Sequence, residues 1–446
     1  MSTTPAANFT QIRPGQISGK NEISFLWRPG VVLVDLVYDP GTGKLRFVTK
    51  DSAGARISDT ASLKWFENGV QLKPLEWLQR AAHRGAIGFP SQPVAYENVD
   101  MLAEAIRGFV HRYFDCDEQF EHVATAYVLM TWVYEKFDAL PYLRFLGEPE
   151  SGKSTGNLVV GAVCYRKFGT GGSQTPAPLY RMIEALGGTL LMDEADFRES
   201  QIGSDVAKIL NSGYRKGFPI ARCNEASYEV EFYDAFGPKI FNGRKPFKDE
   251  AVETRCLTYR PITTTRGDIP LQLPPAFDTD ALDLRNRALS WRLDNLERVT
   301  IINARVDGLG ARATQISLPL LTVVAEINDN ELRERYRKHV IKFALESKED
   351  RVSAKQESTE AALVQAYVDI TGRGAVPTCQ AVADAVLDDD ESPFAMTART
   401  AGWKLRGLGF KTKHGRSGSV VSIDPPRLKA LKVSYGIADV VKEPVT

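Results

Sequence analysis

The pattern of apolar and polar positions divides the chain into segments with different secondary structure. Between residues 22 and 70 apolar and polar residues alternate, as in VVLVDLVYD and KLRFVTKD, around turns at DPGTG and DSAG. A period of two is typical of half-buried strands, so we expect a small antiparallel β module within residues 1–73. From residue 74 to 140 apolar residues recur at three- and four-residue steps, as in FEHVATAYVLMTWVYEKF, which predicts a helical region.

Short apolar runs alternate with helical patterns between residues 141 and 350. YLRFLG, TLLMDE and PKIFNG have the length and composition of buried strands, while residues 280–350 are helical and rich in charge. This alternation predicts the α/β fold class, with a parallel sheet covered by helices on both faces and a helical lid behind it.

The last part of the chain has a different order of elements. QESTE near residue 356 is typical of a linker, and three helical patterns then lead into a hairpin at GFKTKHGRSGSVVSID. Three helices followed by a hairpin is the order of a winged helix-turn-helix, which we therefore expect over residues 358–446.

Composition restricts the kind of protein further. Hydrophobic residues make up 43% of the 446 residues and charged residues 25%, the balance of a soluble folded chain. The sequence has neither a secretory signal nor an apolar run of about 18 residues that could span a membrane, so we expect a cytoplasmic protein without membrane contact.

Five widely spaced cysteines argue against a zinc ribbon or a disulfide framework. Basic and acidic residues balance at 56 each, so any nucleic-acid site must be local.

The strongest motif is GEPESGKS, a complete GxxxxGK[ST] phosphate-binding loop between an expected strand and an expected helix. Backbone N–H groups of such a loop converge on phosphates, and the positive end of the following helix adds to the attraction. We expect Lys153 to reach the β and γ phosphates of ATP and Ser154 to hold Mg²⁺. The residues expected to bind the nucleotide here are Gly147, Glu148, Pro149, Glu150, Ser151, Gly152, Lys153, Ser154 and Thr155.

Two acids follow the apolar run TLLM. Asp193 is expected to orient the water shell of Mg²⁺, and Glu194 to polarise the attacking water. Two unpaired charges at the end of a buried strand are costly, which favours a catalytic use over a purely structural one. Capping of a helix by the acids is the alternative.

Three further polar residues extend the expected nucleotide site. Asn242 ends the run PKIFNG, where a neighbouring strand would lie beside the γ-phosphate, although Asn-Gly is also a common turn. Arg255, before the run CLTY, is poorly placed for its own nucleotide and well placed to reach across a ring interface as an arginine finger; a surface salt bridge is the alternative. Arg312, in the helical lid, is a candidate second sensor.

Basic residues with interleaved aromatics cluster in the C-terminal region between Thr397 and Arg416. A recognition helix followed by a basic wing would neutralise phosphates along a groove of duplex DNA, whereas docking of a protein is the alternative. We expect Trp403 and Phe410 to lie in the core. The expected DNA contacts are Lys404, Arg406, Lys411, Lys413 and Arg416.

Together, GEPESGKS, LLMDEAD, the stretch ending in FGPKIFNG, and ETRCLTYRP resemble the motif set of superfamily 3 helicases. They are more similar still to the helicase halves of phage and plasmid primase–helicase proteins, over residues 118–330. The resemblance implies an AAA+ P-loop core that assembles as a homo-hexamer on DNA. By position it also implies a channel hairpin over residues 216–233, in which Lys216 and Arg222 would contact single-stranded DNA.

No primase domain precedes the expected motor in this sequence, so the resemblance implies a separate primase or loader as a partner. Two functions remain open at this point. The first is an ATP-dependent DNA helicase in the replication of a phage, plasmid or other mobile element. The second is an AAA+ initiator or regulator that binds duplex DNA through its winged helix without unwinding it. Glu194 and Arg255 disfavour a metabolite kinase.

Overall fold

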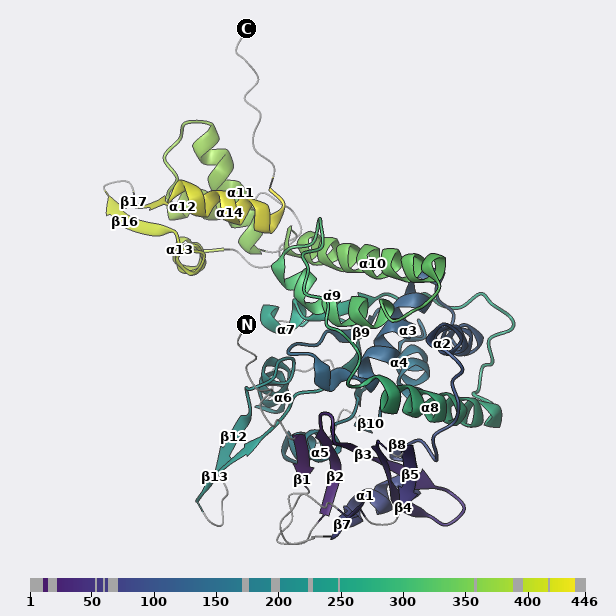
Figure 1. Ribbon diagram of the computed structural model, residues 1–446. Helices are drawn as coiled ribbons and strands as arrows, with labels where there is room; N and C mark the ends of the chain where they lie inside the picture. Colours follow the sequence, from purple (N-terminus) through teal and green to yellow (C-terminus); the bar gives the residue numbers. More distant parts are fainter. Residues whose placement is uncertain are drawn as a thin grey trace, which may run out of the picture. The chain divides into compact units, whose positions relative to one another are not determined.

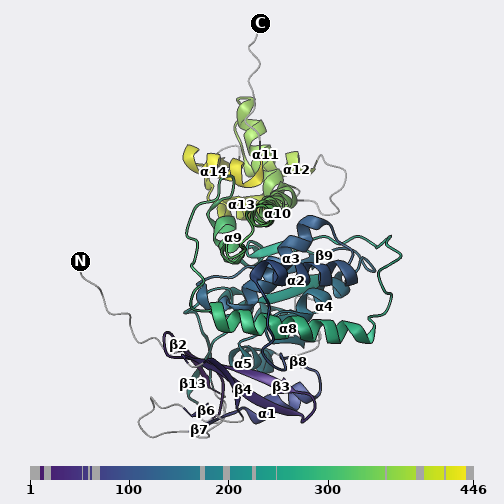
Figure 2. The same ribbon diagram turned by 45° about the vertical axis from the view of Figure 1, so that its right-hand side comes forward.

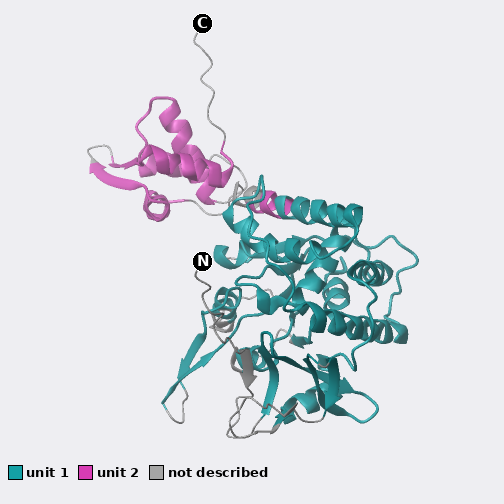
Figure 3. Ribbon diagram, viewed as in Figure 1, with its two compact units in different colours: residues 1–345 teal, residues 346–446 magenta. Residues whose placement is uncertain are grey.

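The computed structural model describes residues 11–14, 22–52, 54–58, 61–62, 71–170, 176–193, 201–223, 228–247, 249–356, 359–387, 396–415 and 418–437. The chain divides into two compact units, residues 1–345 and 346–446 (Figure 3). Each unit is described by itself.

A six-stranded sheet forms the centre of the first unit (Figure 1). Its order is β15-β9-β14-β11-β10-β8, in which the first five strands are parallel and β8 is antiparallel to β10. The expected parallel sheet is therefore confirmed. The strands are β8 (Ile87–Gly88), β9 (Tyr142–Leu146), β10 (Lys167–Thr170), β11 (Leu190–Met192), β14 (Lys239–Gly243) and β15 (Cys256–Tyr259).

Helices cover both faces of this sheet because side chains alternate along its buried strands. Leu143 and Ile240 pack in one core with α2, α3, α4, α8, α9 and α10, whereas Tyr142 and Phe241 pack in a second core with α1, α5 and α6 (Figures 1 and 2). The helices are α1 (Glu76–His83), α2 (Val99–Tyr113), α3 (Glu118–Trp132), the 3-10 turn η1 (Tyr134–Lys136), α4 (Lys153–Ala162), α5 (Pro176–Leu186), α6 (Gln201–Ser212), α7 (Glu250–Glu253), α8 (Pro275–Asn295), α9 (Ala311–Val324) and α10 (Asn330–Gln356).

A second sheet precedes the central one in the chain, with the order β5-β4-β3-β2-β7-β6 and β1 paired to β2. Strands β2 to β5 are antiparallel neighbours, as the alternating pattern predicts, but β7 lies parallel to β2. The strands are β1 (Gln11–Pro14), β2 (Glu22–Arg28), β3 (Val32–Asp39), β4 (Lys44–Asp51), β5 (Gly54–Ser58), β6 (Ala61–Ser62) and β7 (Gln71–Pro74).

A buried charge network joins this second sheet to the helices of the central one. Asp35 on β3 accepts hydrogen bonds from Arg166 at 2.5 Å and from Arg292 at 2.8 Å, and Arg292 also binds Glu135 at 2.9 Å. All four side chains are at most 1% exposed. Burial alone would raise the pKa of Asp35, but the charges of Arg166 and Arg292 outweigh it and hold that pKa below its ordinary value.

The second unit contains a three-helix core and a hairpin. Its elements are α11 (Thr359–Gly372), α12 (Cys379–Leu387), α13 (Ala398–Gly407), β16 (Lys411–Gly415), β17 (Gly418–Ser422) and α14 (Pro425–Tyr435). Leu363, Val382, Leu405 and Phe410 are buried together at its centre.

Among the described residues, none of the helices combines the length and the apolar character that crossing a membrane requires.

Candidate nucleotide site

The phosphate-binding motif forms the turn between β9 and α4. Gly152 precedes the helix with φ +88°, a left-handed conformation that glycine adopts without strain, and Glu150 also has a positive φ of 63°. Gly156 lets α4 approach the sheet, because a Cβ there would lie 2.6 Å from the ring of Phe145. The first N–H groups of α4 and its positive dipole end therefore point out of the carboxyl edge of the sheet.

Lys153 lies over this turn. Its ammonium group donates to the backbone oxygen of Glu148 and lies 3.4 Å from Ser151 Oγ. Glu148, Pro149 and Glu150 are exposed, so the turn is open to solvent on one side.

Three residues from three separate motifs meet beside the start of α4. Asn242 Nδ2 donates to Asp193 Oδ1 at 2.6 Å and to Ser154 Oγ at 3.1 Å, and Ser154 Oγ donates to Asp193 Oδ1 at 3.2 Å. Asn242 is buried, whereas Ser154 and Asp193 are exposed. The buried amide therefore orients two oxygen groups that face solvent.

The order of the strands explains this meeting. β14 lies between β9 and β11, so the residues at the carboxyl ends of all three strands share one edge of the sheet. Asn157 on α4 adds a further link, since its Nδ2 donates to the backbone oxygen of Met192 at 3.1 Å. Asn157 was not predicted from the sequence; its place one helical turn after Ser154 is the signal that would identify it.

The chemistry of this donor set fits a magnesium ion. Mg²⁺ prefers oxygen ligands and uses one or two protein groups together with water and phosphate oxygens. Ser154 and Asp193 offer a hydroxyl and a carboxylate oxygen within hydrogen-bond distance of each other. Glu194, the expected base, lies outside the described residues.

Arg255 and Arg312, by contrast, lie at the opposite edge of the sheet. The backbone oxygen of Arg255 accepts from Tyr142 N at the amino end of β9, and the guanidinium group binds Asn211. Arg312 contacts the Tyr214 hydroxyl at 3.5 Å, and the Tyr214 backbone oxygen accepts from Leu140 N just before β9. A five-residue strand is about 16 Å long, so β9 separates both arginines from the phosphate turn of their own chain.

The structure therefore groups Arg312 with Arg255 around Tyr214. The role of Arg312 as a second sensor stays a prediction. Tyr214 and Asn211, which hold the pair, were also not identified from the sequence. In the sequence, Asn211 and Tyr214 stand out only as a polar and an aromatic residue at the end of the helical pattern in ILNSGYRKG.

The expected channel hairpin is formed by β12 (Ile220–Cys223) and β13 (Val230–Tyr233), which pair in antiparallel register. The two cations expected to contact DNA face their own chain. Lys216 Nζ donates to the backbone oxygen of Glu135, and the Arg222 guanidinium lies 5.5 Å from the ring centroid of Tyr180. Among the described residues of the hairpin, the large exposed side chains are Tyr228 at 83%, Phe232 at 63% and Val230 at 59%.

A buried lysine fixes both ends of this hairpin. Lys239 Nζ donates to the backbone oxygens of Gly213, Ala235 and Gly237 at 2.9 to 3.1 Å. Burial lowers the pKa of Lys239 to about 7. Lys239 begins β14, and Asn242 lies near the end of the same strand. One strand therefore contacts the backbone on both sides of the hairpin and also carries a residue of the nucleotide site.

The basic residues of the second unit have different environments. Lys404 pairs with Glu360 at 2.6 Å and Arg406 binds Thr412 at 3.3 Å, whereas Lys411 and Lys413 are exposed on β16. Arg416 lies outside the described residues.

The two aromatic residues of this region also differ. Phe410 is buried as expected, but Trp403 is 70% exposed, so its assignment to the core is wrong. Arg399, Trp403 and Arg406 are spaced i, i+4 and i+7 on α13 and therefore share its exposed face, because the helix buries its opposite side against the core.

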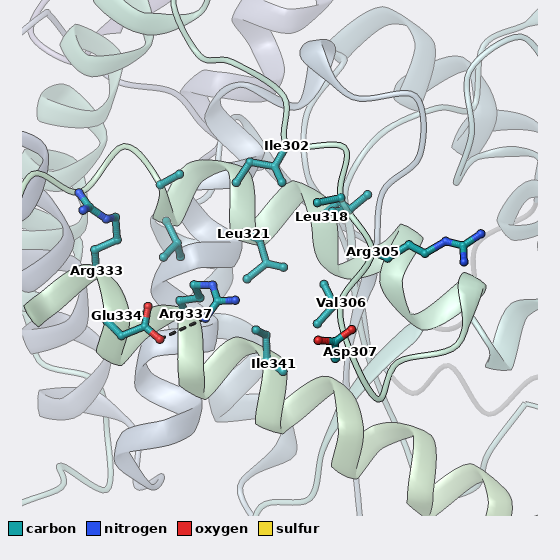
Figure 4. Close-up of a pocket in the computed structure, with 13 residues that line it drawn as sticks. Ile302, Arg305, Val306, Asp307, Leu318, Leu321, Arg333, Glu334, Arg337 and Ile341 are labelled. Carbon is teal, nitrogen blue, oxygen red and sulfur yellow. Dashed lines mark hydrogen bonds and ion pairs between the residues drawn. The ribbon is translucent and has the colours of Figure 1, made fainter. Parts of the chain in front are cut away.

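A separate cavity of about 410 Å³ lies between the segment around Val306, α9 and α10 (Figure 4). Its wall combines apolar side chains such as Leu318 and Ile341 with Arg305 and the ion pair Arg337–Glu334. The cavity has no residue in common with the nucleotide site.

Comparisons with known proteins give weak likenesses. No family model and no curated protein sequence matches the chain. The A form apo structure of the NrS-1 C-terminal region is similar at 10% identity and a TM-score of 0.36, over 87% of this chain and 96% of that one. The SCCmec type IV Cch active helicase is similar at 11% identity and a TM-score of 0.36, over 93% and 88% of the two chains. Scores of this size leave the function to be judged from the site itself.

Proposed function

We propose that the chain is an ATP-dependent DNA helicase of the AAA+ type that moves along single-stranded DNA as a ring, in the replication of a phage, plasmid or other mobile element. The observation that carries the proposal is the meeting of Ser154, Asp193 and Asn242 beside a complete phosphate-binding turn.

The residues of the site divide the work of ATP hydrolysis. The turn from Gly147 to Thr155 holds the phosphates through backbone N–H groups, and Lys153 adds a cation to the β and γ phosphates. Ser154 and Asp193 hold Mg²⁺, which neutralises charge on the phosphates when it is bound. Asn242 positions the attacking water, and Glu194 polarises it.

The place of Arg255 supports the proposal of a ring. Because Arg255 lies at the amino edge of the sheet, we propose that the phosphate it approaches is bound by a second copy of the chain. In a closed ring, the nucleotide site of every copy faces the Arg255 of a neighbouring copy. We propose six copies on the strength of the family resemblance. A separate primase or loader supplies priming and placement on DNA.

The hairpin β12–β13 is proposed to contact the single strand. Lys216 and Arg222 already contact their own chain, so in this proposal they support the hairpin. Tyr228 and Phe232 then provide aromatic surfaces on which bases stack, an interaction of about 1–3 kcal/mol per base that does not depend on sequence. Replacement of both by Ser should leave basal ATP hydrolysis intact and remove its stimulation by single-stranded DNA.

The direct test of the proposal compares Lys153→Ala with Glu194→Gln. The first should lose nucleotide binding. The second should bind ATP as the unaltered protein does and hydrolyse it at least about 10²-fold more slowly, since a positioned base contributes that much. Hydrolysis by Glu194→Gln near the normal rate contradicts the assignment.

A second candidate function is an initiator that binds duplex DNA without unwinding it. The exposed face of α13, with Arg399, Trp403 and Arg406, favours it, as do Lys411 and Lys413 on the neighbouring strand. Together with the order of its elements, this face supports a winged helix in the second unit. If removal of residues 358–446 ends all DNA binding while the Tyr228 and Phe232 variant unwinds normally, the initiator becomes the better account.

A further inference from the structure

Tyr214 brings two arginines from distant parts of the chain together. The Arg255 guanidinium carbon lies 3.7 Å from the centroid of the Tyr214 ring and that of Arg312 lies 5.3 Å from it. Arg312 also donates to the Tyr214 hydroxyl at 3.5 Å. The electron-rich face of the ring attracts both cations, which offsets part of their mutual repulsion.

A chain of hydrogen bonds fixes Arg255 in this group. Asp249 caps α7 by accepting from Ala251 N at 2.8 Å, and it also accepts from Asn211 Nδ2 at 2.6 Å. Asn211 Oδ1 in turn accepts from Arg255. Arg255 is only 7% exposed, yet its Nε has no partner within the described residues, so one donor of the buried guanidinium is left over.

Arg312 gives this group its access to solvent. Its side chain is exposed and lines an open cavity of about 1120 Å³ together with Arg305 and Gln315. The backbone oxygens of Arg255 and Tyr214 accept hydrogen bonds at the amino end of β9, so the group is anchored at the sheet edge opposite the phosphate turn.

We propose that Tyr214 holds Arg255 and Arg312 as one unit that a subunit presents to the nucleoside triphosphate of its neighbour, so that Arg312 acts in trans. This inference rests on the proposed hydrolysis in a ring. Two adjacent guanidinium groups suit a γ-phosphoryl group, which carries charge on several oxygens as its bond to the leaving group breaks. Tyr214 is a positioning residue in this account, and it does not touch the nucleotide.

The position of Arg312 is tested by mixing inactive subunits, with rings allowed to form from separated chains. Arg255→Ala mixed with Lys153→Ala is the reference, because the first has an intact pocket and the second an intact finger. If Arg312 acts in trans, Arg312→Ala should recover turnover with Lys153→Ala. Arg312→Ala should not recover turnover when it is mixed with Arg255→Ala. Every subunit then lacks one of the two arginines that it presents to the nucleotide of its neighbour.

The reverse pattern overturns the inference alone. If Arg312→Ala recovers with Arg255→Ala and not with Lys153→Ala, Arg312 serves the nucleotide of its own subunit while the ring account stands. If even the reference mixture stays at the residual rate of each variant, Arg255 does not act in trans, and both the inference and this part of the proposed function fail.

The part of Tyr214 is tested by comparing Tyr214→Phe with Tyr214→Leu. Phe keeps the ring over which Arg255 lies, so it should retain kcat within about threefold, whereas Leu should lower kcat at least about tenfold. The KM for ATP should stay within about twofold, because a finger that acts in the transition state contributes little to ground-state binding. Equal kcat for Phe and Leu variants that assemble normally contradicts the role of the ring.

Discussion

Asn242 Nδ2 donates a hydrogen bond to Asp193 Oδ1 at 2.6 Å, across the boundary between two parallel strands. Because the amide is buried and the carboxylate is exposed, the contact orients a group that faces solvent. We predict that Asn242→Ala still binds ATP through the phosphate-binding turn and hydrolyses it at least about 10²-fold more slowly. Binding is measured by titration with a fluorescent nucleotide and turnover by release of phosphate. A variant that hydrolyses ATP normally removes Asn242 from the mechanism.

The buried network around Asp35 predicts a large effect on folding. Asp35→Asn leaves Arg166 and Arg292 without their shared carboxylate, and loss of one partner of a buried pair costs about 3–5 kcal/mol. Asp39→Asn on the same strand is the matched control, since Asp39 pairs with Arg46 where both side chains are partly exposed, and such a pair should contribute much less to stability. Urea unfolding monitors both variants. Equal and small losses for the two would mean that the network is not needed for stability.

Acid should destabilise the first unit through His122. Its ring contacts His339 Nδ1 at 2.8 Å, and burial together with the charge of His339 lowers the pKa of His122 from 6.5 to about 4. The unfolded chain binds a proton below pH 6.5 and the folded chain does so only near pH 4, so stability falls as the pH drops between these values. The expected loss is about 3 kcal/mol.

The His122→Asn variant tests this prediction, with His83→Asn at the surface as the control. Unfolding free energies at pH 7 and pH 4.5 should differ less for His122→Asn than for the unaltered protein. His83→Asn should keep the original difference. The same pH dependence in all three proteins would exclude His122 as its source.

The exposed face of α13 predicts a fluorescence signal from DNA binding. Trp403 fluorescence should change when duplex DNA is added, and Trp403→Phe should remove the change. Arg399→Ala or Arg406→Ala should each lower the salt dependence of binding by about 0.9 in log–log slope. Lys404→Ala is the control, because Lys404 already pairs with Glu360 and should change the slope little. Full binding of duplex DNA by a variant that lacks both arginines and Trp403 would contradict a DNA contact at this face and leave protein docking as the alternative.

The sequence predicts the nucleotide edge of the central sheet better than its amino edge. Lys153, Ser154, Asp193 and Asn242 each follow or end an apolar run, and in a parallel sheet such positions converge on one edge. Local pattern and tertiary position therefore agree there.

The other edge depends on contacts between distant segments. Tyr214 and Arg312 meet across 98 positions of sequence, and no local pattern predicts that a lid arginine turns toward a tyrosine there. Trp403 shows that the local pattern of apolar residues does not always predict burial. Its helix buries Leu405 and exposes the larger side chain of Trp403. Hydrophobic size alone favours the opposite arrangement.

Strand separation tests the central claim most directly. The substrate is a short duplex with one single-stranded tail and a fluorophore and quencher at its blunt end, given with ATP, with a non-hydrolysable analogue, or with ATP and Asn242→Ala. We predict that the unaltered protein separates the strands only with ATP, that the analogue supports binding alone, and that Asn242→Ala separates them at least about 10²-fold more slowly. A protein that hydrolyses ATP and binds the tailed duplex but leaves its strands paired would contradict the helicase.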